Sequence, residues 1–182
     1  MPFGKRKERV KTEYNEPLLW DYALGALGRR MRTVSQMRLL LRRKVADRSE
    51  YAEVLVETVM ARLREQKLLD DERFAEIFSS YRRDNEKFGK RRVQNDLRSK
   101  GVKPEVVDTA LGETYAEVND EQQARDYIRR KRMKQPTNEK ETARIFRGLV
   151  RAGFGAKTIF TVLKQWNVPE EALGALEDQL DL

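Results

Sequence analysis

Three consecutive acids, Asp70, Asp71 and Glu72, are the densest group of side chains in this sequence that could support chemistry. Carboxylates this close together could hold a magnesium ion and support cleavage of a nucleic acid. Adjacent acids also stand at helix starts, where they cap free N–H groups and suit the helix dipole. We favour a cap for a helix that begins near Arg73 and keep a magnesium-dependent nuclease as the weaker alternative.

Other routes to catalysis are few, because the chain has no cysteine and no histidine. Their absence excludes disulfides, zinc sites of the usual Cys/His type and the common pairs of nucleophile and base. Ser79 and Ser80 have no evident base partner in the sequence. We therefore expect a protein that is not an enzyme, with no catalytic residues, no metal site and no cofactor.

Basic residues are the more prominent candidates for a functional surface. Lysine and arginine number 38 against 30 acids, and the resulting net charge of +8 favours a polyanionic or acidic partner. They cluster in three successive parts of the chain, and for any single one the alternative is an ordinary solvated helix face with local Glu–Arg pairs. The candidate binding residues are Arg29, Arg30, Arg43 and Lys44; then Arg82, Arg83, Lys90, Arg91, Arg92, Arg98 and Lys100; then Arg129, Arg130 and Lys131. The third part also contains Arg144, Arg147 and Arg151, which are not among these candidates.

Three similar segments indicate that one structural unit occurs three times. Leu41, Leu97 and Leu149 stand 56 and 52 residues apart, and each has an apolar residue four positions earlier. Upstream of each, an alanine precedes a basic cluster. A period of about 50 residues is typical of proteins whose units stack on one another.

Within each unit, apolar residues recur at helical spacing, as in the run Phe74, Ile77, Phe78 and Tyr81, and no comparable stretch alternates with a period of two. The sequence therefore predicts an all-α fold of three tandem three-helix repeats stacked into an elongated curved rod. The expected divisions are a basic N-terminal arm without fixed structure (1–16), repeats at 17–71, 72–120 and 121–168, and an acidic C-terminal capping helix or tail (169–182).

Proline and glycine mark where helices should start and stop. Pro104 suits the first turn of a helix, and Gly101 and Gly153 stand where the second helix of a unit should end. Gly25 and Gly28 fall inside the first expected helix, where each costs about 1 kcal/mol relative to alanine. We expect a close helix crossing to explain these two glycines.

Several segments together resemble a known family. These are YALGALGRRMRTVSQMRLLLRRK (22–44), LLDDERFAEIF (68–78) and GKRRVQNDLRSKGV (89–102). They are similar to the RecX regulators of the bacterial RecA recombinase, and the resemblance covers roughly residues 20–168. The last segment has the family's spacing of a basic residue, an apolar residue, leucine, lysine and glycine. The third unit departs from it, because Ala152 stands where the second unit has Lys100.

The resemblance implies three tandem three-helix units and a role in recombination, DNA repair and the SOS response. It implies a protein that lodges in the groove of the RecA–DNA filament and inhibits ATP hydrolysis, strand exchange and co-protease activity. It also implies binding of single- and double-stranded DNA. The basic residues named above would then contact RecA, DNA or both.

The main alternative is a helix-turn-helix-like transcriptional regulator, because three-helix units with a basic second helix are similar to such modules. Few amide side chains on the basic helices could read base edges, only Gln36, Gln94 and Asn95. No apolar run approaches membrane-spanning length, and the basic N-terminus lacks the apolar segment of a secretory signal. We therefore expect a cytoplasmic monomer with no membrane partner.

Overall fold

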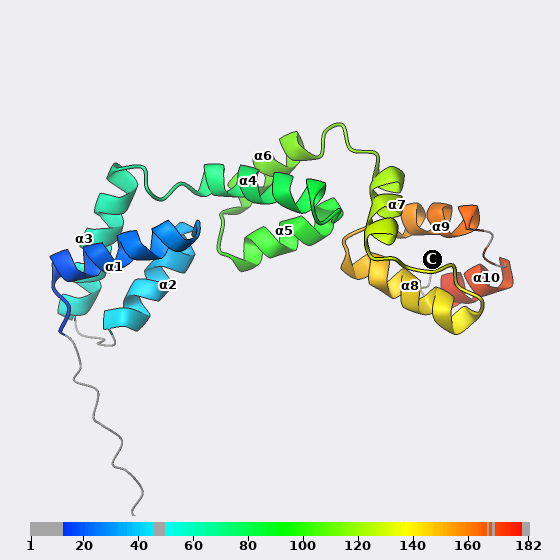
Figure 1. The fold of residues 1–182 in the computed structure, drawn as a ribbon, viewed down its shortest axis with the longest axis horizontal. Helices are drawn as coiled ribbons and strands as arrows, with labels where there is room; N and C mark the ends of the chain where they lie inside the picture. The colour runs from blue at the N-terminus through cyan, green and yellow to red at the C-terminus, as the bar shows by residue number, and fades with distance from the viewer. Residues whose placement is uncertain (1–12, 46–49, 167, 169, 180–182) are drawn as a thin grey trace, which may run out of the picture. The chain divides into compact units, whose positions relative to one another are not determined.

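The structure is a computed structural model that describes residues 13–45, 50–166, 168 and 170–179. Within these residues every regular element is an α-helix, as the sequence predicts (Figure 1). Most of the expected N-terminal arm, residues 1–12, and the end of the acidic tail, residues 180–182, lie outside the described residues. The chain divides into two compact units, residues 1–70 (unit 1) and 71–182 (unit 2), and each is described by itself.

Unit 1 is a single three-helix repeat. Its helices are α1 (Glu16–Arg29), α2 (Val34–Val45) and α3 (Glu50–Glu65). Helix α3 packs against the other two, and one apolar core lies between them. A capping box starts α2: Thr33 Oγ1 accepts from the Gln36 N–H at 3.1 Å, and Gln36 Oε1 accepts from the Thr33 N–H at 3.4 Å. This cap sets where α2 begins and therefore which of its faces meets the core.

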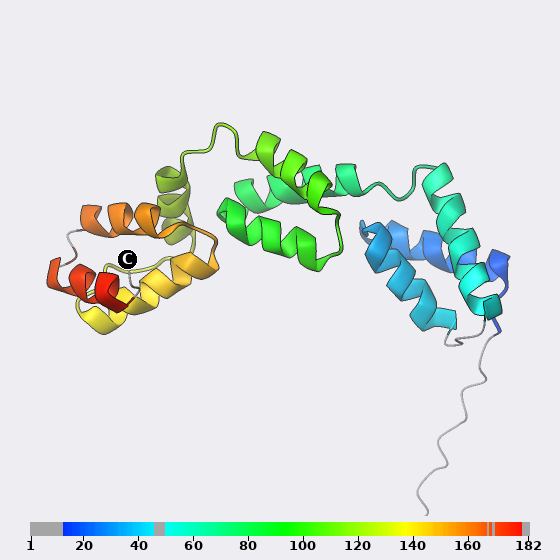
Figure 2. The same cartoon turned by 180° about the vertical axis from the view of Figure 1, so that it is seen from behind.

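Unit 2 holds two further three-helix repeats and one more helix (Figure 2). Helix α6 packs on α4 and α5, and α9 packs on α7 and α8, as α3 does in unit 1. The last helix, α10, lies within the expected acidic segment and packs against α8. The helix bounds are α4 (Asp71–Asp84), α5 (Lys90–Ser99), α6 (Pro104–Thr114), α7 (Asp120–Arg130), α8 (Glu139–Arg151), α9 (Ala156–Gln165) and α10 (Glu170–Gln179).

Equivalent positions in the three repeats have equivalent surroundings. Leu41, Leu97 and Leu149 each lie in the second helix of their repeat, and all are 0% exposed. Full burial of a leucine stabilises the fold by roughly 1.5–3 kcal/mol, so each is an energetic anchor. The three tandem three-helix repeats are therefore confirmed. The elongated rod concerns how the units are placed relative to one another, and it stays a prediction.

One expectation about the first helix is wrong. A Cβ atom on Gly28 would meet nothing within 4 Å, and one on Gly25 would meet only the tip of Arg29 at 3.8 Å, so no close crossing explains these glycines. Of the apolar residues in the run on α4, Ile77 and Tyr81 are 44% and 55% exposed. The apolar run of α4 extends further round the helix than the face that α5 and α6 cover.

The second and third repeats meet through direct backbone contact. The N–H of Gly89, just before α5, donates to the carbonyl of Ala152, just after α8, at 2.9 Å. A Cβ atom on Gly89 would stand 2.5 Å from the carbonyl oxygen of Gly153, and one on Gly153 would overlap the backbone of Arg92. Gly153 also has a φ of +94°, which side chains disfavour. We call this contact of Gly89 with Ala152 and Gly153 the repeat joint.

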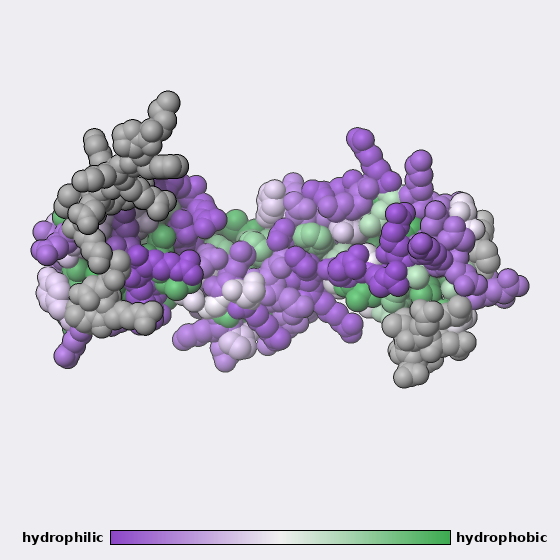
Figure 3. All heavy atoms as spheres, turned by 90° about the horizontal axis from the view of Figure 1, so that it is seen from below, coloured by the Kyte–Doolittle hydropathy of each residue, from purple (hydrophilic) through white to green (hydrophobic). Residues whose placement is uncertain are grey.

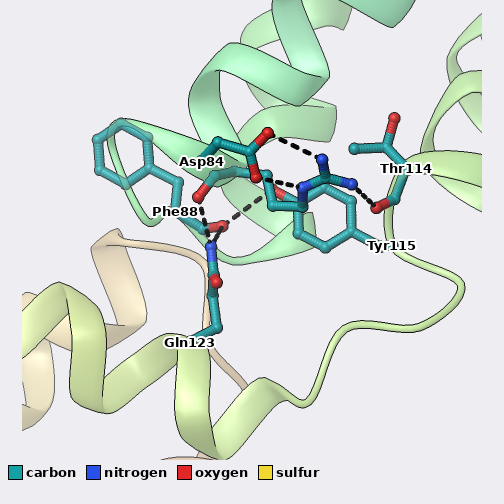
Figure 4. A network of polar contacts seen from close by, with 6 residues as sticks. Asp84, Phe88, Thr114, Tyr115 and Gln123 are labelled. Carbon is teal, nitrogen blue, oxygen red and sulfur yellow. Dashed lines mark hydrogen bonds and ion pairs between the residues drawn. The ribbon is translucent and has the colours of Figure 1, made fainter.

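Side chains from α4, from α7 and from the end of α6 form hydrogen bonds around the turn that precedes Gly89 (Figure 4). The Gln123 amide donates to the carbonyl of Arg83 at 2.7 Å, and the Tyr115 hydroxyl donates to the carbonyl of Phe88 at 2.9 Å. Arg83 in turn donates to the carbonyl of Thr114 at 2.6 Å. The first two bonds satisfy carbonyls at the end of α4 and in the turn that follows it, and the third satisfies the carbonyl of the last residue of α6. The turn is thereby fastened to α7, and the two repeats form one body.

Candidate functional site

Three exposed cations of unit 1 without acidic partners lie at the end of α1 and on α2. Arg29, Arg30 and Arg43 are exposed, and no carboxylate of the described residues lies within 4.0 Å of their guanidinium groups. Their long side chains are therefore available to an outside anion. All three are among the binding residues that the sequence suggests.

Other cations of unit 1 are held by their neighbours. The Lys44 ammonium lies 5.4 Å and 4.8 Å from the ring centres of Tyr14 and Tyr22, and its hydrogen bond to Tyr14 raises the pKa of Lys44. Arg38 on α2 pairs with Glu57 on α3 at 2.6 Å, and this hydrogen bond lowers the pKa of Glu57. Such pairs tie α2 to α3 and reduce the charge that the surface offers to a partner.

In unit 2 three exposed cations without acidic partners belong to α5. Lys90, Arg91 and Arg98 are exposed, and within the described part of the chain none of them pairs with an acid. The helix begins after Gly89 without a side-chain cap, and its first turn has no acidic residue. The positive end of the helix dipole therefore adds to the side-chain charges and favours an anion at this end of α5.

Arg92 on α5 and Arg82 on α4 share one carboxylate. Asp96 lies 2.7 Å from Arg82 and 3.2 Å from Arg92. The Arg82 guanidinium lies 5.0 Å from the ring centres of both Phe78 and Phe88, which fixes its position. One negative charge thus balances two positive ones, and a surplus of positive charge remains around Arg92.

Two further predicted residues hold the repeat joint together. Arg83 pairs with Asp84 at 2.7 Å, and this bond raises the pKa of Arg83 and lowers that of Asp84. Arg130 on α7 pairs with Glu86 in the turn between α4 and α5 at 3.0 Å. Both arginines therefore have structural partners, whatever else they bind.

The remaining predicted residues differ in how free they are. Arg129 is 76% exposed, although it pairs with an aspartate one turn earlier at 3.2 Å. The ammonium groups of Lys100 and Lys131 lie 5.2 Å and 5.8 Å from the ring centres of Phe78 and Tyr127. Each keeps its charge near the surface while the ring restrains it.

A basic stripe on α8 is a further candidate surface. Its residues were not among the binding residues chosen from the sequence. Lys140, Arg144, Arg147 and Arg151 are exposed, and no ion pair joins them to any described residue. Their spacing of four, three and four residues puts them on one side of the helix. That spacing is visible in the sequence and could have identified the stripe. Hydrophilic residues also predominate on the face drawn in Figure 3.

The described residues offer little for catalysis. No group of three or more acidic side chains that could hold a metal ion occurs in residues 13–45, 50–166, 168 and 170–179. A cavity of about 450 Å³ between α7 and α9 has Ile128, Met133, Val162 and Trp166 in its wall, with Arg125, Arg129 and Gln165 around them. None of these residues is a usual nucleophile or base. In the same part of the chain no helix combines the length and the apolar composition that a membrane span requires.

Comparison with known proteins gives the family. A family model described as "RecX, second three-helix domain" matches residues 70–111, which hold α4, α5 and most of α6. The regulatory protein RecX of Myxococcus xanthus is 36% identical over 163 residues, covering 82% of this chain and 84% of that protein. The chain belongs to the RecX family of regulatory proteins.

Other RecX proteins add the fold and a difference in length. A crystal structure of RecX from Lactobacillus salivarius superposes with a TM-score of 0.59 over 84% of this chain and 96% of that chain, at 18% identity, which supports the fold. The RecX protein of Halalkalibacterium halodurans is 33% identical over 108 residues, yet this chain spans only 39% of its length. RecX relatives therefore include chains much longer than the region matched here.

Proposed function

We propose that this RecX protein is a non-catalytic modulator of the RecA recombinase, which binds in the groove of the RecA–DNA filament and restrains ATP hydrolysis, strand exchange and co-protease activity. The observation that carries the proposal is the set of exposed cations without acidic partners in both units. Among the residues that the sequence suggests, these are Arg29, Arg30 and Arg43 in unit 1 and Lys90, Arg91 and Arg98 in unit 2. Membership of a family of regulatory proteins supports a regulatory role.

Repetition supports a polymeric partner. Each repeat presents basic residues on a three-helix scaffold of the same design, so the chain can contact successive sites on a helical polymer. Linking several weak contacts in one chain raises the overall affinity by avidity, without any single strong site. A protein that bridges neighbouring recombinase subunits would restrain the movements that ATP turnover requires.

Contact with DNA phosphates is the accessory part of the proposal. Binding that neutralises six to ten phosphates should weaken by about 10³–10⁵ between 50 and 200 mM salt. The affinity of the protein for single- and double-stranded DNA, measured by fluorescence anisotropy over this range, tests it. A flat response to salt would remove phosphate contact from the mechanism.

The helix-turn-helix-like regulator has less support, because amide side chains that would read base edges are already engaged. Gln36 takes part in the capping box of α2, and Gln94 on α5 donates to Asp108 at 3.3 Å. Asn95 on α5 is the exposed amide that remains of the three. A mobility-shift comparison of unrelated duplexes separates the two functions, since a strong preference for one sequence would favour the regulator.

The decisive experiment is the DNA-dependent ATPase activity of the cognate RecA with this protein added. We expect the wild-type protein to lower the rate, and the triple variant Lys90→Glu, Arg91→Glu, Arg98→Glu to lower it much less while keeping its helical content. Lys157→Glu is the control, because Lys157 is exposed in the first turn of α9 and is not among the proposed binding residues. An unchanged ATPase rate at stoichiometric wild-type protein would rule the proposal out.

A further inference from the structure

Three arginines from three helices adjoin the repeat joint: Arg92 lies against Gly153, Arg130 pairs with Glu86, and Arg151 directly precedes Ala152. Arg92 lies on α5, Arg130 on α7 and Arg151 at the end of α8, next to the Ala152 carbonyl that accepts the Gly89 hydrogen bond. Burial raises the pKa of Tyr127, and the charges of Arg130, Arg151 and Arg92 oppose that rise, so all three lie within electrostatic reach of its phenol. We call these three arginines and Tyr127 the joint cluster.

Acidic residues orient two arginines of the joint cluster. Each of these arginines keeps N–H donors that the acid does not occupy. Arg92 is oriented by Asp96, whose other oxygen is held by Arg82, and Arg130 is oriented by Glu86. A guanidinium has five N–H donors, so a single carboxylate does not saturate it. Arg151 is exposed and has no acidic partner among the described residues.

Tyr127 supplies a neutral donor in the middle of these charges. Its ring packs between Phe88 and Phe154, with centroid distances of 5.8 Å and 5.9 Å, and the residue is only 8% exposed. No donor or acceptor in the described residues forms a hydrogen bond with its hydroxyl. The hydroxyl is not one of the fully buried side-chain atoms that lack a partner, so it reaches the surface and an outside acceptor can meet it.

Positive charge dominates around the joint cluster. Three guanidinium groups face two carboxylates, Glu86 and Asp96, and Asp96 is also shared with Arg82. The uncapped start of α5 lies at the same joint, because Gly89 both precedes this helix and bonds to Ala152. Like charges repel one another when they are brought together, and a bound anion relieves that repulsion.

The geometry favours a phosphate over a carboxylate. A carboxylate offers two oxygens in one plane, and Asp96 already takes one arginine on each of them, whereas a phosphate offers oxygens in several directions. Donors that come from three helices suit the second arrangement. We propose that the joint cluster binds one backbone phosphate of a nucleic-acid strand, and that the phosphate also fastens the second repeat to the third. This rests on the DNA contact included in the proposed function.

The donors of the joint cluster come from both the second and the third repeat. Arg92 belongs to the second repeat, whereas Arg130, Arg151 and Tyr127 belong to the third. A ligand that binds only when both sets are in place stabilises the docked arrangement by mass action. Phosphate binding and stability of the repeat joint should therefore rise together.

The test compares four full-length proteins: wild type, Arg151→Gln, Tyr127→Phe and the control Lys140→Gln. Lys140 loses the same charge on the same helix, about 16 Å from Arg151 along α8. The probe is a labelled single-stranded oligonucleotide, followed by fluorescence anisotropy, with sodium pyrophosphate as competitor. Thermal unfolding with and without pyrophosphate is measured in parallel.

We expect Arg151→Gln to lower the affinity for the oligonucleotide about tenfold or more, the usual effect of losing a hydrogen bond to a charged group, and Lys140→Gln to lower it less. Tyr127→Phe should lower the affinity while leaving the unfolding midpoint without pyrophosphate unchanged, because its hydroxyl has no partner to lose. Pyrophosphate should raise the midpoint of the wild type and of Lys140→Gln, but not that of Arg151→Gln.

Other results would contradict binding of the strand, nucleic acid as the source of the phosphate, or the role of the Tyr127 hydroxyl. Equal affinities for Arg151→Gln and Lys140→Gln would mean that the joint cluster does not bind the strand. Stabilisation by pyrophosphate without competition against the oligonucleotide would leave a phosphate site but exclude nucleic acid as its source. If the wild type binds no oligonucleotide, the DNA contact of the proposed function fails, and the pyrophosphate shift alone decides whether the cluster binds phosphate. An unchanged affinity in Tyr127→Phe would remove the hydroxyl from the site.

Discussion

Replacing Gly89 with alanine tests the repeat joint at its closest point. The φ of −72° and ψ of 158° at Gly89 suit any residue, so backbone conformation gives no reason for glycine here. The reason is space, because a Cβ atom would stand 2.5 Å from the carbonyl oxygen of Gly153 and 2.7 Å from its carbonyl carbon. Backbone cannot rotate away as a flexible side chain can, so the two repeats must move apart.

The size of the effect follows from opposing contributions. Forcing a methyl group into a filled contact costs about 1–3 kcal/mol. Weakening the bond from Gly89 to Ala152 costs about 1 kcal/mol more. Reduced freedom of the unfolded chain offsets these costs by about 0.4–1 kcal/mol. We therefore expect Gly89→Ala to lower the free energy of unfolding by about 1–3 kcal/mol, a large part of the roughly 5–15 kcal/mol of a typical domain.

Urea unfolding followed by far-ultraviolet circular dichroism measures this difference. Gly112→Ala is the matched control, because Gly112 lies in α6 and a Cβ atom there would meet nothing within 4 Å. The control should be about 1 kcal/mol more stable than the wild type, since alanine is the better helix former. A Gly89→Ala protein as stable as the wild type would refute the close backbone contact.

Three further predictions concern the core and the ion pairs. Leu97→Ala should cost about 2–5 kcal/mol in urea unfolding, because Leu97 is 0% exposed in a filled core, and a smaller loss would mean that the site collapses easily. A double-mutant cycle on Arg38 and Glu57 should give a coupling of at most about 1 kcal/mol, since both side chains are partly exposed. Because Arg38 lowers the pKa of Glu57, this coupling should be present at neutral pH and disappear as the pH falls below about 4, and a coupling that persists in acid would contradict the pairing. Burial raises the pKa of Tyr115, so its contribution to stability should be complete below about pH 10 and be lost as the pH rises further. Tyr115→Phe should reduce this alkaline loss, while Tyr51→Phe, at a 68% exposed position, should not.

The sequence by itself determined the class of fold and the repeat. Helical periodicity is encoded within a few residues, and the anchor leucines keep the same place in each repeat, so both are visible without coordinates. Gly101 and Gly153 were expected to end second helices, and both adopt positive φ just after α5 and α8. The net charge and the lack of cysteine and histidine likewise required no structure. Recognition of the family depended on the same local patterns.

Only the tertiary structure decided which cations are free and where the second and third repeats touch. Whether Arg38 meets Glu57, or Gly89 meets Gly153, depends on how helices cross, and the crossing is set by side chains far apart in the chain. The departure at Ala152 is explained in the same way: it is 1% exposed at the repeat joint, where a lysine would bury its charge. Local spacing fixes the face of each helix, but contacts between distant segments depend on packing, which no short stretch of sequence encodes.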